Sequence, residues 1–173
     1  MPSQRPDTQV ELSELLCFDL YAASRALTAV YRPLLAELGL TYPQYLVLVV
    51  LWRDEKQTVR QLSEALHLDY GTLTPLLRRM ESNGLITRQR RLDDQRSVNI
   101  ELTATGAALR SQVRHVQDAI RSAVGLDDTQ VTALQVSLRS VAASAGDRPQ
   151  GAGVARFPNG KPADTARHLP TVV

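Results

Sequence analysis

Residues 58–102 carry the most informative pattern of the chain and read TVRQLSEALHLDYGTLTPLLRRMESNGLITRQRRLDDQRSVNIEL. Thr58 and Gln61 stand three residues apart at the start of an apolar-periodic segment, the pattern of a capping box. Gly84 closes a second periodic segment, as glycine commonly does just after a helix. The stretch therefore predicts two short helices joined by a tight turn, with the second helix starting at 70–72 because Pro75 is tolerated only in a first turn.

Two strand-like segments follow these helices. Residues 85–91 and 98–102 alternate apolar and polar side chains, as half-buried strands do. Between them lies the charged segment LDDQRS, residues 92–97, which predicts the tip of a hairpin. Two helices joined by a tight turn and followed by a hairpin predict a winged helix–turn–helix, a fold that is mainly α with a small β-hairpin.

Helical periodicity continues on the N-terminal side of this core. Residues 10–32 carry apolar side chains at spacings of three and four, and Pro33 is expected to kink or end that helix. Pro43 is expected to open a second helix through about Trp52, buried because it is almost wholly apolar.

Two more helices are expected on the C-terminal side, one over about 104–124 capped by Thr103 and one over about 128–143 capped by Asp127-Asp-Thr-Gln130. After residue 145 the composition shifts to Gly, Pro, Arg and Asp without periodicity. We therefore expect a flexible N-terminus over 1–9, one winged-helix domain over 10–143 and a flexible tail over 144–173.

Composition excludes some classes of protein and favours another. The longest apolar run has eight residues, 45–52, too short to cross a bilayer, and the N-terminus lacks an apolar signal segment, so a cytoplasmic location is expected. The net charge is only +2, yet residues 70–100 hold six arginines against three acidic side chains. A local basic patch on a nearly neutral body favours a directed nucleic-acid surface.

Side chains suited to DNA gather on the second helix of the core. Tyr70, Thr72 and Thr74 at its start are able to reach base edges, and Gly71 permits close approach to the duplex. Either Asp69 or Thr72 is expected to cap this helix. Asp69 and Arg88 are further DNA-binding candidates, as are Arg78 and Arg79, which are suited to phosphates or guanine.

The hairpin supplies a second candidate contact. Arg96 near its tip is able to enter a minor groove, where the negative potential is strongest. Asp94 has the wrong charge for DNA, and its expected role is to orient Arg96 through a charge-assisted hydrogen bond.

A lone cysteine, Cys17, lies in the first predicted helix and cannot form a disulfide within its own chain. Cys17, Tyr21, Ser24, Thr28 and Tyr31 share one semi-polar helix face. Tyr31 lies 14 residues after Cys17, or about 21 Å along a straight helix. Phenols that hydrogen-bond this thiolate must therefore come from a bend in the chain or from another subunit.

The sequence of residues 62–106, LSEALHLDYGTLTPLLRRMESNGLITRQRRLDDQRSVNIELTATG, resembles the winged core of the multiple-antibiotic-resistance regulator (MarR) family. The shared features include the Asp-x-Arg of the wing, Asp94 and Arg96, and the Leu-Thr-x-x-Gly that opens the next helix at Leu102. The resemblance covers about residues 12–143. It implies a homodimer with interleaved dimerisation helices, here 10–40 and 104–143, and a DNA-binding part over 58–102. Tyr70 departs from the serine that relatives often carry, which bears on the operator sequence.

Residues 16–52, LCFDLYAASRALTAVYRPLLAELGLTYPQYLVLVVLW, resemble the organic hydroperoxide resistance regulator branch of that family. The resemblance implies that Cys17 is oxidised by organic hydroperoxide to sulfenic acid, and that Tyr31 and Tyr42 hold it from the partner subunit with Tyr21 nearby. The oxidised dimer then leaves its inverted-repeat operator on double-stranded DNA, ending repression. Because the chain has no second cysteine, the oxidised Cys17 is expected to react with a low-molecular-weight thiol or to proceed to irreversible forms.

Three alternatives remain open at the level of sequence. The first is a MarR-type repressor released by a small aromatic or phenolic ligand, with Cys17 structural. The second is a one-cysteine thiol peroxidase, disfavoured because the three histidines are scattered and no Cys–His pairing is suggested by spacing. The third is a DNA-compacting protein without sequence preference. No cofactor, metal site or membrane partner is expected.

Overall fold

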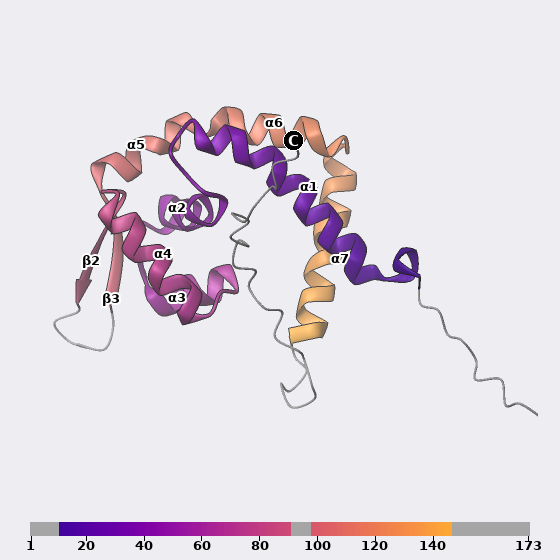
Figure 1. Ribbon diagram of the computed structural model, residues 1–173, viewed down its shortest axis with the longest axis horizontal. Helices are drawn as coiled ribbons and strands as arrows, with labels where there is room; N and C mark the ends of the chain where they lie inside the picture. Colours follow the sequence, from indigo (N-terminus) through magenta and orange to yellow (C-terminus); the bar gives the residue numbers. More distant parts are fainter. Residues whose placement is uncertain (1–10, 91–97, 147–173) are drawn as a thin grey trace, which may run out of the picture. The chain divides into compact units, whose positions relative to one another are not determined.

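The computed structural model describes residues 11–90 and 98–146 (Figure 1). The chain divides into two units, the first ending at Leu126 and the second beginning at Asp127. The second unit contains α7, Asp128–Gly146. The first unit begins with a single 3₁₀ turn, Leu12–Glu14, and its remaining elements are α1 Leu16–Ala36, α2 Tyr42–Asp54, β1 Lys56–Thr58, α3 Val59–Leu66, α4 Tyr70–Ser82, β2 Ile86–Arg90, β3 Val98–Leu102, α5 Ala104–Gln112 and α6 Arg114–Val124.

Helix α1 continues past Pro33 to Ala36, so the helix does not end at that proline. Pro33 lies in the last turn of the helix, where its missing N–H removes a single hydrogen bond. Gly39 then takes a positive φ of 67°, and the Leu40 N–H donates to the Leu35 carbonyl at 2.9 Å. This arrangement satisfies the last carbonyls of the helix and reverses the chain toward α2.

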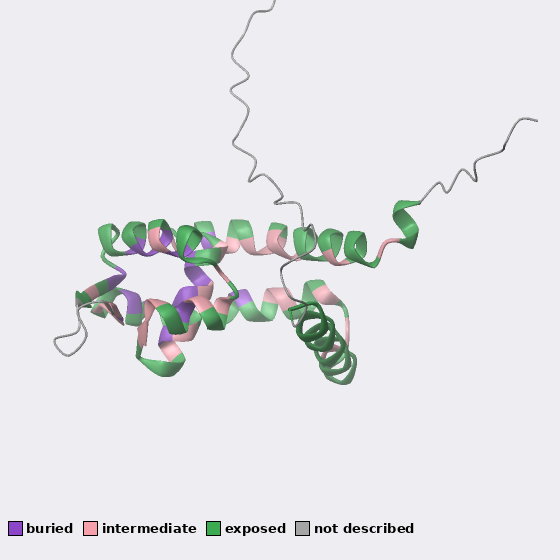
Figure 2. Ribbon diagram, turned by 90° about the horizontal axis from the view of Figure 1, so that it is seen from below, coloured by how far each residue is buried: buried purple, intermediate pink, exposed green. Residues whose placement is uncertain are grey.

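Helix α2 begins at Tyr42 and ends at Asp54, one residue before and two residues after the predicted bounds. The Thr41 N–H donates to the Gln44 side chain at 2.8 Å, so these two residues form a capping box. The helix contributes Val47, Leu48 and Leu51 to the fully buried core of the first unit. Buried residues, purple in Figure 2, gather in the winged part, whereas α1 is exposed along most of its length.

Helices α3 and α4 form the predicted helix–turn–helix. Thr58 caps α3 through the predicted box with Gln61, and α4 begins at Tyr70. The turn between them passes through His67, whose φ of 52° and ψ of 39° are left-handed. Pro75 lies in the second turn of α4, and its predicted restriction to a first turn is wrong. The helix tolerates it because the proline removes only the bond to the Gly71 carbonyl.

The hairpin belongs to a three-stranded antiparallel sheet with the order β1-β3-β2. Strand β2 pairs with β3 so that Arg88 lies opposite Ile100. Strand β1 pairs with the other edge of β3, and Lys56 there forms an ion pair with Glu101. The sequence did not predict β1, because three residues are too few to show an alternating pattern.

The single helix predicted over 104–124 is instead two helices, α5 and α6, interrupted at Val113. Val113 has φ −90° and ψ 2°, outside the helical region, and its side chain is buried. Apolar periodicity continues across this residue, so the pattern alone gave no sign of the interruption. After Val113, the chain continues as α6, which packs against α1 as Figure 1 shows.

In the second unit, α7 starts where its cap predicts. The Gln130 N–H donates to the Asp127 carboxylate at 2.9 Å, and the Asp127 N–H donates to the Gln130 side chain at 3.0 Å. The helix extends to Gly146, so residues 144–146 of the expected tail are helical. Within residues 11–90 and 98–146, none of the helices has the length and apolar character needed to cross a membrane.

Candidate nucleic-acid interface and sensing site

The outward face of α4 is built by four exposed residues, Gly71, Pro75, Arg78 and Ser82. Their spacings of four, three and four place them in one row along the helix. The opposite face is fully buried or nearly so through Leu73, Leu76, Leu77 and Met80. Pro75 and Ser82 were not predicted as site residues, although this same spacing could have identified them.

The other predicted residues of α4 lie beside this row. Thr72 and Arg79 line one flank together with Asn83, and they border a groove of about 430 Å³ shared with the start of α2. Tyr70 is 53% exposed at the N-terminal end of the helix, and Thr74 is half-buried. All of these side chains therefore surround the outward row of α4.

Asp69 is the N-cap of α4. Its carboxylate accepts from the Thr72 N–H at 2.8 Å and from the Thr72 hydroxyl at 2.9 Å. These two hydrogen bonds hold the pKa of Asp69 below its ordinary value, so the carboxylate is ionised at neutral pH. A Cβ on Gly71 would lie 3.0 Å from an Asp69 oxygen, which favours glycine beside the cap.

Arg88 lies in β2 and turns toward the end of α4. Its Nη1 atom is 3.6 Å from the Glu81 carboxylate, and its side chain is only 22% exposed. The Nε atom is buried without a hydrogen-bond partner. The ion pair between Arg88 and Glu81 therefore joins β2 of the wing to the end of α4. Asp94 and Arg96, predicted for the wing tip, lie outside the described residues.

Cys17 is exposed one residue into α1. Tyr21, one turn further along, is also exposed, and its hydroxyl accepts a hydrogen bond from Arg25 Nη1 at 3.1 Å. The Arg25 guanidinium carbon also lies 5.6 Å from the centre of the Tyr21 ring. A cation is therefore held two turns from the cysteine.

Tyr31 and Tyr42 pack against each other at the far end of α1. Their ring centroids are 4.8 Å apart, and the buried Tyr45 ring lies 5.7 Å from Tyr31. Burial, followed by the neighbouring phenols, raises the pKa of Tyr31 to about 12 and also raises the pKa of Tyr42. Both phenols are therefore neutral near pH 7 and able to donate hydrogen bonds.

The structure does not bring Cys17 and this phenol pair together within one chain. Cys17 and Tyr31 belong to the same uninterrupted helix, so 14 residues separate them by about 21 Å. Two further residues, Tyr45 and Trp52, continue the aromatic packing from the phenol pair and were not predicted as site residues. Tyr45 and Trp52 lie seven residues apart on α2, a helical spacing that the sequence does show. The contacts of Tyr45 with Tyr31 and of Trp52 with Gly106 join different elements, and sequence spacing carries no signal for them.

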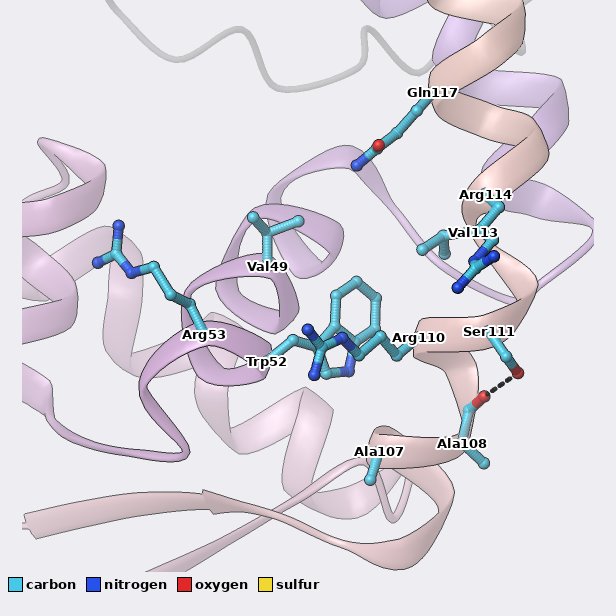
Figure 3. A pocket seen from close by; sticks show the side chains of 10 residues that line it. All are labelled: Val49, Trp52, Arg53, Ala107, Ala108, Arg110, Ser111, Val113, Arg114 and Gln117. Carbon is cyan, nitrogen blue, oxygen red and sulfur yellow. Dashed lines mark hydrogen bonds between the residues drawn. The ribbon is translucent and has the colours of Figure 1, made fainter.

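A cavity of about 610 Å³ lies between α2 and the α5–α6 segment (Figure 3). Its lining includes Trp52, Arg110 and Arg114. Arg53 also borders it, but the Arg53 guanidinium donates two hydrogen bonds to the Asp54 carboxylate and is directed away from the other side chains in Figure 3. An aromatic surface beside cations suits a planar anion. In the part of the chain that the structure describes, no three His, Cys, Asp or Glu side chains are grouped to hold a metal ion.

Comparison with known proteins identifies related chains. The family model of the transcriptional regulators SarA and Rot matches residues 29–113. The chain is 51% identical over 111 residues to the organic hydroperoxide resistance transcriptional regulator of Bacillus subtilis (strain 168), covering 64% of this chain and 76% of the relative. It is 42% identical over 137 residues to the HTH-type transcriptional regulator TtmR of Methylorubrum extorquens (strain PA1), covering 79% of this chain and 70% of the relative.

A solved structure shows the same fold. The structure of reduced AbfR bound to DNA, a protein of Staphylococcus epidermidis, matches with a TM-score of 0.66 and 32% identity, covering 79% of this chain and 96% of that chain. The predicted winged helix–turn–helix is thereby confirmed. The named relatives are regulators of transcription, which agrees with the prediction that the chain is not an enzyme. The chain belongs to the MarR-like family of winged-helix transcriptional regulators.

Proposed function

We propose that the protein is a homodimeric repressor that binds an inverted-repeat operator and releases it when an organic hydroperoxide oxidises Cys17. The observation that carries this proposal is the exposed, solitary thiol on α1 in a chain 51% identical to a peroxide regulator. The neutral phenols of Tyr31 and Tyr42 on the same chain are the hydrogen-bond donors that such a thiolate requires.

DNA is contacted by the outward row of α4 in the major groove. Gly71 and Pro75 lack long side chains there, so the helix is able to approach the base edges closely, while Arg78 reaches guanine or phosphate. Arg79 and the Thr72 hydroxyl lie on the flank, where phosphate contacts fix the register. Arg96 of the predicted wing tip is expected to reach the adjacent minor groove, oriented by a charge-assisted hydrogen bond to Asp94.

The dimer is formed through apolar residues that face solvent in the single chain. On α1 and just before it, Leu12, Leu16 and Phe18 are between 38% and 61% exposed. On α7, four apolar side chains are at least 40% exposed, namely Leu134, Val136, Leu138 and Val141. Large exposed apolar side chains gathered on two helices are typical of a protein–protein interface.

Sensing joins one thiol to the phenols of the other subunit. The Cys17 thiolate attacks the terminal peroxide oxygen, an S–O bond forms, the O–O bond breaks, and the alkoxide leaves as an alcohol after taking a proton. Tyr31 and Tyr42 of the partner subunit donate hydrogen bonds to the thiolate before the reaction and to the charged oxygen during it. A low-molecular-weight thiol then condenses with the sulfenic acid, forming a mixed disulfide and water.

A mobility shift on the protein's own promoter tests the proposal. Wild type and Cys17→Ser are compared with and without cumene hydroperoxide, after the oxidation state of Cys17 is verified by mass spectrometry. The wild type is expected to release the DNA after oxidation, and Cys17→Ser to remain bound. Wild-type binding that is unchanged by full oxidation of Cys17 would overturn the sensing role of the thiol.

A second candidate is favoured by the cavity between α2 and the α5–α6 segment. Arg110 and Arg114, which line this cavity together with Trp52, suit a small aromatic acid, which would release the DNA without any chemistry at Cys17. The same mobility shift with benzoate-type compounds distinguishes the two candidates. If the aromatic-acid candidate is correct, the ligand releases Cys17→Ser from the DNA as fully as it releases the wild type.

A further inference from the structure

A continuous series of aromatic contacts leads from the sensing phenols into the core. The Tyr31 ring contacts both Tyr42 and the buried Tyr45. The Tyr45 ring lies 6.2 Å from the Trp52 ring in an edge-on arrangement with an interplanar angle of 64°. Since buried rings are close-packed, a displacement of Tyr31 or Tyr42 must be accommodated by Tyr45 and then by Trp52.

Trp52 connects α2 to α5 through a hydrogen bond. Its indole Nε1 donates a hydrogen bond of 2.9 Å to the carbonyl of Gly106, 54 residues away in the chain. The bond is part-buried, and a buried indole N–H without an acceptor is costly. The carbonyl of Gly106 must therefore move with the indole.

Gly106 in turn lies against the backbone at the base of the wing. A Cβ at this position would be 2.1 Å from the Leu85 carbonyl oxygen, so the two backbones touch without an intervening side chain. The Thr103 hydroxyl donates to the Gly84 carbonyl at 2.6 Å, and the Thr103 N–H donates to the Leu85 carbonyl at 3.1 Å. These contacts attach the start of α5 to the segment that joins α4 to β2.

We infer that Trp52 is a positioning residue that couples the sensing phenols to the base of the wing. The inference rests on the proposed function, and it names the route by which that site is regulated. When oxidation of Cys17 displaces Tyr31 and Tyr42, the Trp52 indole shifts, and the Gly106 carbonyl follows it. Because Gly106 has no clearance from Leu85, the shift reorients the segment between α4 and the wing.

The surroundings of Trp52 permit this movement. The indole is half-buried and borders the cavity of about 610 Å³, beside Arg110 in Figure 3. Open space on one side and close-packed rings on the other allow a second position for the side chain.

Trp52→Phe tests the route because it keeps an aromatic ring and removes only the N–H donor and the second ring. The oxidised-to-reduced ratio of operator Kd values is expected to fall at least fivefold below that of the wild type, since allosteric couplings typically span about 5–150-fold. Reduced Trp52→Phe should bind the operator within about threefold of the wild type. Ser111→Ala is the matched control, since Ser111 lines the same cavity but bonds the Ala108 carbonyl, outside the series.

The wild-type protein offers a second measurement that needs no variant at this position. Trp52 is the only tryptophan of the 173 residues, so intrinsic tryptophan emission reports on this junction alone. Its emission maximum is expected to shift when cumene hydroperoxide oxidises Cys17, and to stay constant in Cys17→Ser. The emission is recorded without DNA, so it does not depend on operator release.

The outcomes separate the two proposals. If oxidised wild type leaves the operator while its Trp52 emission stays constant, or while Trp52→Phe is released as fully as wild type, the coupling role of Trp52 is overturned and the proposed function stands. If oxidised wild type stays on the operator, the proposed function is overturned. A shifted emission that depends on Cys17 still supports the coupling in that case, and a constant emission overturns it.

Discussion

Gly106 shows how one missing side chain shapes this protein. Its backbone touches that of Leu85, and a Cβ added to it would lie 2.1 Å from the Leu85 carbonyl oxygen. Gly106→Ala must therefore push the start of α5 away from the wing. We expect the free energy of unfolding to fall by about 1–3 kcal/mol, as for other overpacked sites, in urea unfolding followed by circular dichroism.

Gly146→Ala is the control for this substitution. Gly146 ends α7, and nothing lies within 4 Å of a Cβ there. Its free energy of unfolding should stay within the range of ordinary surface substitutions, about 0.5 kcal/mol. Equal stabilities for Gly106→Ala and the wild type would contradict the close contact between α5 and the wing.

Tyr31 predicts a pH dependence of stability. Its pKa is raised from 10.0 to about 12 in the folded protein, so the folded state keeps the phenolic proton longer than the unfolded chain does. The stabilising contribution is complete below about pH 10 and is lost as the pH rises toward about 12. Removing the hydroxyl in Tyr31→Phe removes this contribution.

The measurement compares the two proteins in alkaline solution. The stability of the wild type relative to Tyr31→Phe should decline between about pH 10 and 12, measured by urea unfolding at each pH. Parallel pH profiles for the two proteins would show that the Tyr31 phenol is not perturbed by its burial.

At the scale of elements, α4 holds a proline where helices rarely tolerate one. Pro75 is exposed in the second turn and deprives the Gly71 carbonyl of its helical partner. Pro75→Ala restores that bond, at the cost of a more flexible unfolded chain. We expect a net stabilisation of about 1–2 kcal/mol, seen as a raised Tm.

Pro43→Ala is the corresponding control. Pro43 lies in the first turn of α2, where proline is favoured because its missing N–H has no helical partner. This variant should gain no stability. A Tm rise of the same size in both variants would mean that helix position does not decide the effect.

Elements with a local start signal were predictable from the sequence. The capping boxes at Thr58 and Asp127 place α3 and α7 correctly, because each box is completed within four residues. Strand β1 and the interruption at Val113 were not predictable. The first exists only through its pairing with β3, and the second interrupts a periodicity that continues on both sides.

The candidate site was likewise predictable where it depends on local spacing and not where it depends on packing between elements. The outward row of α4 follows from spacing alone, even though Pro75 and Ser82 were overlooked. The contact between Tyr45 and Trp52 follows helical spacing within α2. The contacts of Tyr45 with Tyr31 and of Trp52 with Gly106 depend instead on how α2 packs against α1 and α5. The side chains at the wing tip, Asp94 and Arg96, lie outside the described residues, so their roles remain predictions.

At the scale of the whole molecule, the exposed apolar side chains of α1 and α7 predict self-association. Leu16 is 61% exposed and Leu138 is 40% exposed in the single chain. The double variant Leu16→Glu, Leu138→Glu would bury two charges in the proposed interface, which is strongly unfavourable. We expect monomers in sedimentation velocity, with helical content retained by circular dichroism.

Operator binding supplies the second part of this prediction. A monomer engages one half-site only, so binding of the double variant to the full operator should weaken by at least about tenfold. Wild-type protein that already sediments as a monomer while binding the full operator would contradict the dimer.

The unbroken course of α1 has a consequence for genetics. Because Cys17 and Tyr31 of one chain are about 21 Å apart, each sensing site of the proposed dimer draws its thiol and its phenols from different copies. Cys17→Ser alone and Tyr31→Phe, Tyr42→Phe alone should each give cells that do not respond to peroxide. Co-expressed, the two alleles form mixed dimers in which one complete site is restored. Recovery of the peroxide response in such merodiploid cells would reveal intragenic complementation, and it would show whether one intact site per dimer is enough to signal.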